Sequence, residues 1–314
     1  MSQSEHIYPA GRVSLREVGL RDGLQMTKSF PSTTAKRKWI ELEYAAGVRH
    51  FEVGSFLPVD KYPMFADVHE VINIIAGLSG AHGAALALNK RGTIDALQSG
   101  VAEIGCVISA SEDHNLANTR RSQNETLAEI DNLCRLRDLS AHKPVISVGI
   151  AMAFGCSLSG AVDPKNVLML MARCYEMGVD MVSLADTVGY AGPSQVAALV
   201  KDARKVAMGK GLGVHLHDTR GMGIANASAA LDEGVQLIDA AMGGLGGCPF
   251  APAATGNIVF DDLVFLCETK GLKTGIEIGE LMKVRDLIQA EMPAETLYGG
   301  VAKAGLPLGF ETRM

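Results

Sequence analysis

The sequence predicts an α/β protein folded as a single (β/α)8 barrel, a TIM barrel, with extra helices at its C-terminal end. Short β-rich runs alternate with amphipathic helical stretches along the chain, and there are eight such runs. Several helical stretches end in a glycine just before the next run, at 45–48, 176–180 and 232–236, where a left-handed helix cap is expected. Repeated strand–helix–strand units predict parallel strands with crossover helices. Eight units in 314 residues fit a barrel, which typically takes ~250 residues; a doubly wound open sheet is the alternative, but it usually carries fewer strands.

The expected strands are short runs rich in β-branched and apolar residues. They cover residues 13–19, 50–55, 83–89, 103–110, 145–152, 181–186, 213–218 and 237–244. The helical stretches repeat apolar residues at spacings of three and four. Clear examples lie at 33–47, 125–139, 166–178 and 193–207. No Pro/Ser-rich linker or charge run divides the chain, so residues 1–314 are predicted to be one domain. Residues 8–270 would form the barrel, and 276–314 would add helices packed against it.

Composition indicates a soluble globular protein with a large core, since 47% of residues are hydrophobic and 20% are charged. A formal charge of −6, from 29 basic and 35 acidic residues, offers no basic excess for nucleic acid. The N-terminus lacks the pattern of a secretory signal, and no apolar run approaches the ~20 residues of a membrane span. Six scattered cysteines without a CxxC pair are typical of a reducing compartment. We therefore expect a cytoplasmic protein with no nucleic acid or membrane partner; a homo-oligomer is left open.

Polar residues gather where the predicted strands end. In a (β/α)8 barrel the active site lies at the C-terminal ends of the strands, so this placement predicts an enzyme and argues against a structural protein. The residues concerned are Glu17, Arg21, Asp22, Glu52, Ser55, Asn89, Glu112, Ser183, Asp186, Thr187, His215, His217, Asp218, Cys248 and Asn257.

The segment VHLHDT, residues 214–219, places two imidazoles one residue apart. Because side chains alternate along a strand, His215 and His217 point to the same face and can share a metal ion. The alternative is a pair of surface histidines. Since the last strand of a barrel closes against the first, Asp22 and Asn257 would add oxygen ligands. Such a set with open positions suits Mg²⁺ or Mn²⁺; zinc stays an alternative, although no thiolate points to a structural zinc site.

Two further segments carry candidate chemistry. In REVGLRDGLQ, residues 16–25, Arg21 supplies a permanent positive charge with several N–H donors, and Asp22 supplies a carboxylate oxygen that can bind a hard cation. The alternative is a salt-bridged turn. The glycine-rich segment 243–257 predicts a closing catalytic loop in which Cys248 is exposed and used. A plain connection is the alternative, and a nucleotide cradle is set aside because neither GxGxxG after the first strand nor GK[ST] is present.

The remaining features have simpler interpretations. The pair Arg120–Arg121 is interpreted as a solvated face, with contact to an anionic substrate tail as the alternative. The other cysteines are expected to pack in the core or on helix faces; they are Cys106, Cys134, Cys156, Cys174 and Cys267.

Five segments in this order resemble the 3-hydroxy-3-methylglutaryl-CoA (HMG-CoA) lyase family. They read SLREVGLRDGLQ, FEVGSF, SLADTVG, HLHDTRGMGIAN and GGLGGCPFAPAATGN. The resemblance runs from about residue 13 to about 275. The RDG and HxHD elements also occur in related isopropylmalate and citramalate synthases, whereas the cysteine-bearing glycine loop is specific to the lyase branch.

The resemblance implies a divalent cation, Mg²⁺ or Mn²⁺, held by four side chains: Asp22, His215, His217 and Asn257. It implies that Arg21 steadies the enolate oxygen of the leaving acetyl-CoA and that Cys248 transfers a proton. His215 or a neighbouring base would take the hydroxyl proton, and Glu52 matches an acidic position near the metal. The positions that would face the acyl-CoA substrate are Gln25, Lys28, Ser55, Ser183 and Thr187.

The implied activity is cleavage of HMG-CoA to acetyl-CoA and acetoacetate. Departures from the family pattern lie at Leu20, Met26, Ala253 and the segment GCSLSG, residues 155–160. They lie beside the acyl pocket and the CoA approach, so a lyase for a different 3-hydroxyacyl-CoA is an alternative. A Claisen-condensing transferase and a non-catalytic binding protein are further alternatives, disfavoured by the cysteine loop and by the intact site residues respectively.

Overall fold

Eight parallel strands close into a barrel in the computed structural model, which describes residues 3–9, 11–247 and 256–312. The strands follow one another in chain order, and β1 closes the ring by pairing with β8. They are β1 Ser14–Glu17, β2 His50–Ser55, β3 His82–Leu86, β4 Glu103–Ser109, β5 Val145–Ala151, β6 Met181–Asp186, β7 Gly211–Leu216 and β8 Leu237–Ala240. The predicted (β/α)8 barrel is confirmed.

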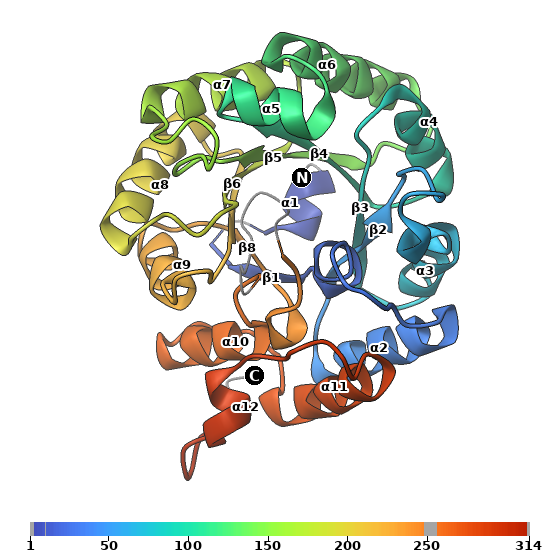
Figure 1. Ribbon diagram of the computed structural model, residues 1–314, viewed down its shortest axis with the longest axis vertical. Helices are drawn as coiled ribbons and strands as arrows, with labels where there is room; N and C mark the ends of the chain where they lie inside the picture. The colour runs from blue at the N-terminus through green and yellow to red at the C-terminus, as the bar shows by residue number, and fades with distance from the viewer. Residues whose placement is uncertain (1–2, 10, 248–255, 313–314) are drawn as a thin grey trace.

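Helices form a ring around the strands (Figure 1). They are α2 Thr33–Ala46, α3 Val68–Ala76, α4 Lys90–Ser99, α5 Glu112–Thr119, α6 Gln123–Leu139, α7 Pro164–Glu176, α8 Pro193–Ala207, α9 Gly223–Asp232 and α10 Phe260–Thr269. The predicted C-terminal helices are also present, as α11 Ile278–Glu291, which packs against α2, and α12 Gly300–Ala304. Within the described residues, no helix is both long enough and apolar enough to cross a membrane.

Most of the predicted strands end one or more residues later than the observed strands, and two of these ends differ by three residues or more. The strand expected at 237–244 stops at Ala240, and Met242–Gly244 form a 3₁₀ turn, η3, because Gly243 takes a positive φ of 63° that a strand does not accommodate. The strand expected at 83–89 stops at Leu86. Asn89 instead caps α4, its side chain accepting a hydrogen bond of 2.9 Å from the Gly92 amide. A short polar side chain at this point satisfies a free helix N–H better than it extends a strand.

The predicted glycine caps are confirmed, most clearly at Gly47 after α2. Its φ is 108°, and a Cβ atom there would lie 2.0 Å from the carbonyl oxygen of Gly275. Only glycine therefore lets the turn into β2 pass beneath the segment that leads to α11. Gly178 and Gly234 also take positive φ values before β6 and β8.

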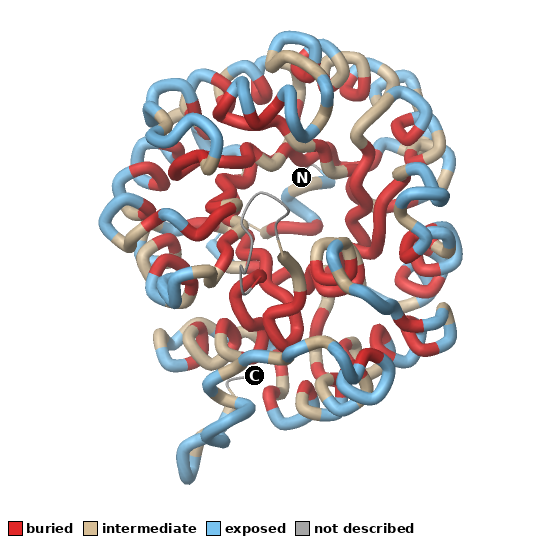
Figure 2. The backbone as a smooth tube through the Cα atoms, viewed as in Figure 1, coloured by how far each residue is buried: buried red, intermediate tan, exposed pale blue. Residues whose placement is uncertain are grey.

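The core lies between the barrel and the inner faces of its helices, while the outer faces of the helices are exposed (Figure 2). Packing of the inner helix faces explains the apolar spacing of three and four read from the sequence. The cysteines predicted to be core residues are all buried; they are Cys106, Cys134, Cys156, Cys174 and Cys267.

A buried polar network fills the N-terminal end of the barrel. Arg16 donates to both carboxylate oxygens of Asp239, at 2.9 and 3.1 Å, and to Glu103 at 2.7 Å. Glu103 also accepts from the Tyr8 hydroxyl at 2.6 Å and from Ser147 Oγ at 2.5 Å. One cation between two carboxylates, with hydroxyl donors around it, satisfies charges that would otherwise be costly to bury.

Two carboxyl groups beneath the first turn after β1 are enclosed, and neither forms an ion pair with a cationic side chain of the described residues. Glu17 accepts hydrogen bonds from the amides of Gly19 and Met242, at 2.9 and 3.0 Å, and Glu43 accepts one from Trp39 Nε1 at 2.6 Å. Burial raises the pKa of Glu17 from its ordinary value of 4.5 to about 7. Burial and the neighbouring Glu17 carboxylate raise the pKa of Glu43 as well.

Stability is therefore expected to depend on the charge of Glu17. Its folded pKa lies above the unfolded value, so the stabilisation is complete below about pH 4.5 and is lost as the pH rises through about 7. We expect Glu17→Gln to lose less free energy of unfolding than wild type between pH 5 and pH 8, as measured by urea denaturation. Glu176→Gln, at an exposed position of α7, is the matched control and should follow wild type. Equal losses in Glu17→Gln and wild type would contradict the prediction.

Candidate active site

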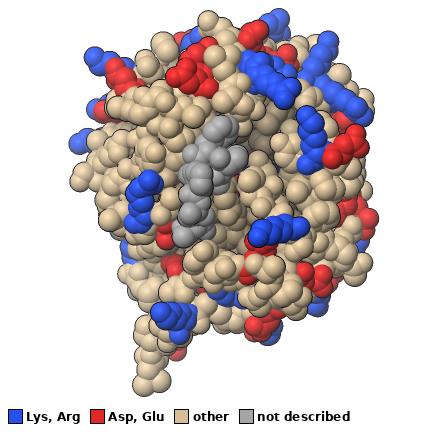
Figure 3. All heavy atoms as spheres, in the orientation of Figure 1, with Lys and Arg blue, Asp and Glu red and all other residues tan. Residues whose placement is uncertain are grey.

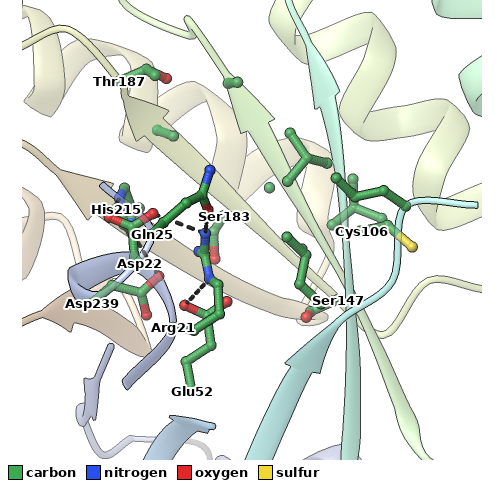
Figure 4. A pocket seen from close by; sticks show the side chains of 18 of the residues that line it. Arg21, Asp22, Gln25, Glu52, Cys106, Ser147, Ser183, Thr187, His215 and Asp239 are labelled. Carbon is green, nitrogen blue, oxygen red and sulfur yellow. Dashed lines mark hydrogen bonds and ion pairs between the residues drawn. The ribbon is translucent and has the colours of Figure 1, made fainter. Parts of the chain in front are cut away.

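A cavity of about 340 Å³ opens at the C-terminal end of the barrel. Part of the set of polar strand-end residues that the sequence singled out meets in it (Figure 4). The described members outside its lining are Glu17, Ser55, Glu112, Asp186, Asp218 and Asn257. Of the predicted site residues, the cavity is lined by Arg21, Asp22, Gln25, Glu52, Ser183, Thr187, His215 and His217. Figure 3 shows this face of the molecule and the hollow in it.

Asp22, His215 and His217 form a group that could hold a metal ion. Each offers one ligand atom, and these atoms lie within 4.8 Å of one another. The two Nε2 atoms are 3.1 Å apart, and Asp22 Oδ2 lies 3.9 Å from His215 Nε2 and 3.8 Å from His217 Nε2. The two imidazoles therefore share one face, as the alternation of strand side chains predicts. His217 is 4% exposed, so a surface pair of histidines is the wrong interpretation.

Asn257, the fourth predicted ligand, lies against this group. Its backbone bridges to His217, and its side-chain amide donates to Asp22 Oδ2 at 2.7 Å and to the Leu245 carbonyl at 2.9 Å. Asn257 Oδ1 is buried and accepts no hydrogen bond from the described residues. Gly246 passes close above it with φ of 126°, where a Cβ atom would lie 2.5 Å from Asn257 Nδ2. A buried, unsatisfied oxygen beside two imidazoles and a carboxylate fits a divalent cation.

Asp239 orients His215 from below, and sequence reasoning missed it. Its carboxylate lies 3.2 Å from His215 Nδ1 and is itself held by Arg16. Occupation of Nδ1 leaves Nε2 directed at the group, as in carboxylate–histidine–metal arrangements. Burial opposes ionisation of Asp239, but the Arg16 guanidinium outweighs it and lowers the pKa to about 2. Burial opposes the charged form of His215, but its hydrogen bond with Asp239 and the negative charges of Asp22 and Asp239 outweigh burial and raise its pKa.

Arg21 lies between Glu52 and the candidate metal ligands Asp22, His215 and His217. The π-helical turn Gly19–Gly23 carries both Arg21 and Asp22, which places them side by side. Arg21 Nε pairs with Glu52 at 2.7 Å, and Nη1 lies 2.9 Å from Asp22 Oδ1 and 3.2 Å from Gln25 Oε1. Burial alone would raise the pKa of Asp22, but the Arg21 guanidinium and the adjacent imidazoles of His217 and His215 hold that pKa well below its ordinary value. Asp22 is thus kept ionised, as a metal ligand must be.

The predicted substrate-side residues differ in where they lie. Ser183 Oγ is buried beside the cavity and has no hydrogen-bond partner among the described residues, whereas Thr187 Oγ1 accepts from the Met152 amide at 2.9 Å. Ser55 and Lys28 are outside the cavity lining: Ser55 donates to the Leu86 carbonyl, and Lys28 is exposed near Glu295. Their substrate-side role stays a prediction. Cys248 lies outside the described residues.

Sequence reasoning did not identify the part of the cavity wall that follows β4. His114, Asn118 and Thr119 line the cavity from α5, and Arg121 follows them. Arg121 is not fully solvated, since it donates to the Leu88 carbonyl at 2.8 Å and faces the cavity. The only signal in the sequence was the position of this segment directly after the fourth strand.

Comparison with known proteins agrees with this geometry. A sequence model of the HMGL-like family matches residues 12–288. The chain belongs to the HMGL-like family. The expected resemblance to HMG-CoA lyases and the expectation of a carbon–carbon lyase are confirmed.

Relatives of this HMGL-like chain have two activities in their names. Hydroxymethylglutaryl-CoA lyase YngG of Bacillus subtilis is 33% identical, over 91% of this chain and 94% of its own. The (R)-citramalyl-CoA lyase of Chloroflexus aurantiacus is 34% identical, over 93% of this chain and 95% of its own. Among solved structures, an HMG-CoA lyase from Acinetobacter baumannii in complex with coenzyme A and 3-methylmalate has a TM-score of 0.87 at 32% identity, covering 96% of this chain and 98% of its own.

Proposed function

We propose that this protein cleaves a branched 3-hydroxyacyl-CoA that carries a carboxylate, with HMG-CoA as the first candidate substrate and acetyl-CoA and acetoacetate as products. The observation that carries the proposal is the meeting of Arg21 with Asp22, His215 and His217 in one cavity. The HMG-CoA lyases among its relatives support it. The (R)-citramalyl-CoA lyase relative makes citramalyl-CoA the second candidate.

Asp22, His215, His217 and Asn257 would hold a divalent cation, and we propose Mg²⁺ or Mn²⁺ because the set mixes nitrogen and oxygen donors without a thiolate. A bound cation would polarise the hydroxyl and carboxylate oxygens of the substrate and make the hydroxyl easier to deprotonate. Asp239 keeps His215 in the tautomer that this set requires.

The reaction breaks the bond between C2 and C3. His215 or a neighbouring base is proposed to take the hydroxyl proton; because His215 Nδ1 is turned to Asp239, His215 can accept it only at Nε2 and only when that atom does not hold the cation. As the bond breaks, C3 becomes a carbonyl carbon and the electron pair remains on C2 as a thioester enolate. Arg21 stabilises the oxygen on which this charge develops, and its pairing with Glu52 fixes the guanidinium. We propose that Cys248 then delivers a proton to C2, which yields acetyl-CoA. Gln25, Ser183 and Thr187 would contact the acyl portion, and Ser55 and Lys28 keep their predicted substrate-side roles.

The direct test mixes purified protein with HMG-CoA and Mg²⁺ and follows acetoacetate. We expect product in the presence of metal and loss of product with EDTA, restored by excess Mg²⁺. A parallel reaction with citramalyl-CoA would release pyruvate if that substrate is used. A protein that binds metal yet cleaves neither substrate would refute the proposal. Consumption of acetyl-CoA in place of its release would favour the condensing transferase.

A further inference from the structure

The interior of the barrel is hollow on the side of β4 and β5. Within these two largely buried strands, the positions that remain partly accessible are Gly105, Val107 and Gly149, and all three line the cavity. Small eight-stranded barrels are ordinarily filled by their inward side chains. Two glycines at inward positions therefore leave space that other residues do not fill.

The hollow is continuous with the candidate active site. In the barrel register Gly149 pairs with Val107 on one side and with Ser183 on the other. Figure 4 shows the arrangement: Ser147 and Cys106 lie across the cavity from Asp22 and His215. A substrate held at the polar side thus faces the hollow directly.

The strand walls of the hollow are apolar and include Ala84, Leu86, Val107 and Ala151. The polar residues His114, Asn118, Thr119 and Arg121 line the same cavity from the segment that follows β4. The polar floor of Arg16, Glu103 and Ser147 is satisfied by its own hydrogen bonds together with Asp239. Because this floor carries two carboxylates against one guanidinium, it would repel an anionic group rather than bind one. The hollow is suited to a hydrocarbon group.

We propose that this lyase prefers substrates whose C3 substituent is an alkyl chain longer than methyl, and that Gly149 sets this preference. The inference rests on the proposed function. C3 is tetrahedral: its hydroxyl and carboxylate-bearing arm face Asp22, His215 and His217, and the thioester arm leads past Arg21 toward the mouth. The fourth substituent is left pointing at the hollow. A methyl group would leave apolar space without contacts, whereas a chain of several carbons would fill it.

Gly149 can be replaced by a residue with a side chain without straining the backbone. Its φ is not in the left-handed region, and a Cβ atom there would meet only Cys106 O and Val107 Cγ2, both at 3.9 Å. Gly149→Val would therefore project methyl groups into the hollow, and Gly149→Ala is the milder variant if valine impairs folding. Gly279→Val, at an exposed position of α11 with open space around it, is the matched control.

The experiment compares 3-hydroxy-3-methylglutaryl-CoA with 3-hydroxy-3-butylglutaryl-CoA, following the common product acetyl-CoA with Mg²⁺ present and with EDTA. We expect wild type to cleave the butyl substrate with a kcat/KM about ten-fold or more above that of the methyl substrate. Gly149→Val should lower this butyl-to-methyl ratio about ten-fold, and Gly149→Ala should lower it less. Gly279→Val should keep the wild-type ratio.

The outcomes separate the inference from the function on which it rests. Cleavage of the methyl substrate with an equal or higher kcat/KM than the butyl substrate overturns the inference and leaves the lyase function standing. An unchanged ratio in a folded Gly149→Val protein overturns the role of Gly149. If neither substrate is cleaved by metal-loaded wild type, the proposed function fails and the inference fails with it.

Discussion

Replacing Arg21 by glutamine is expected to lower kcat by about 10²–10³-fold, the usual effect of removing one group that stabilises a developing oxyanion. Glutamine keeps hydrogen-bonding capacity but removes the charge that lies between Glu52 and Asp22, at 2.7 and 2.9 Å. The effect should fall on kcat, because the enolate charge develops only as the bond breaks. Steady-state kinetics with saturating Mg²⁺ would measure it.

Arg285→Gln is the matched control for this substitution. Arg285 has the same side-chain exposure as Arg21, 12%, and pairs with the fully buried Asp261, but it belongs to α11 and is absent from the cavity lining. We expect the control to lose stability and to keep kcat within about two-fold, since only the fold depends on its ion pair. Retention of near-wild-type kcat in Arg21→Gln would refute the catalytic assignment. Comparable kcat losses in both variants would point to a structural effect instead.

Removing His217 is expected to abolish tight metal binding. Loss of a residue that only supports a metal ligand typically costs 10–100-fold in affinity, so loss of a ligand should cost at least about 100-fold. His217→Ala removes one of the two Nε2 atoms that face each other at 3.1 Å, and the remaining His215 and Asp22 cannot complete the set. Isothermal titration of metal-free protein with Mn²⁺ measures this without reference to turnover.

His142→Ala provides the comparison. His142 also makes one hydrogen bond, to the Val101 carbonyl at 2.8 Å, and lies outside the cavity lining. Its Mn²⁺ affinity should match wild type. Unchanged affinity in folded His217→Ala would contradict the assignment of this histidine as a ligand and would leave Asp22, His215 and Asn257 to be tested in turn.

The convergence of predicted site residues in one cavity has a simple physical basis. In a (β/α)8 barrel, residues at the carboxyl ends of the strands converge whatever their separation in the chain. His215 and His217 could therefore be paired from strand alternation alone, and Asp22 from closure of the last strand on the first. Each of these steps needed only the order of elements and the period of the strand.

Residues that act through buried partners could not be found in this way. Asp239 stands in an apolar strand, LIDA, and nothing in that run shows that its carboxylate reaches His215. Arg16 is the first residue of the predicted site segment 16–25, but its partners Glu103 and Asp239 are 87 and 223 residues away. Such contacts depend on which side chains share the barrel interior at one level, which the tilt and stagger of the strands decide.

The sequence by itself determined the barrel, the end of the barrel that carries the chemistry, and the residue types gathered there, because strand period, helix caps and turn residues act locally. Only the tertiary structure decided how Asp239 orients His215, how Arg21 is clamped between two carboxylates, and that Gly105 and Gly149 leave a hollow facing the site. A glycine in a strand looks the same in the sequence whether it faces a helix or a cavity. Its effect is set by the side chains that surround it after folding.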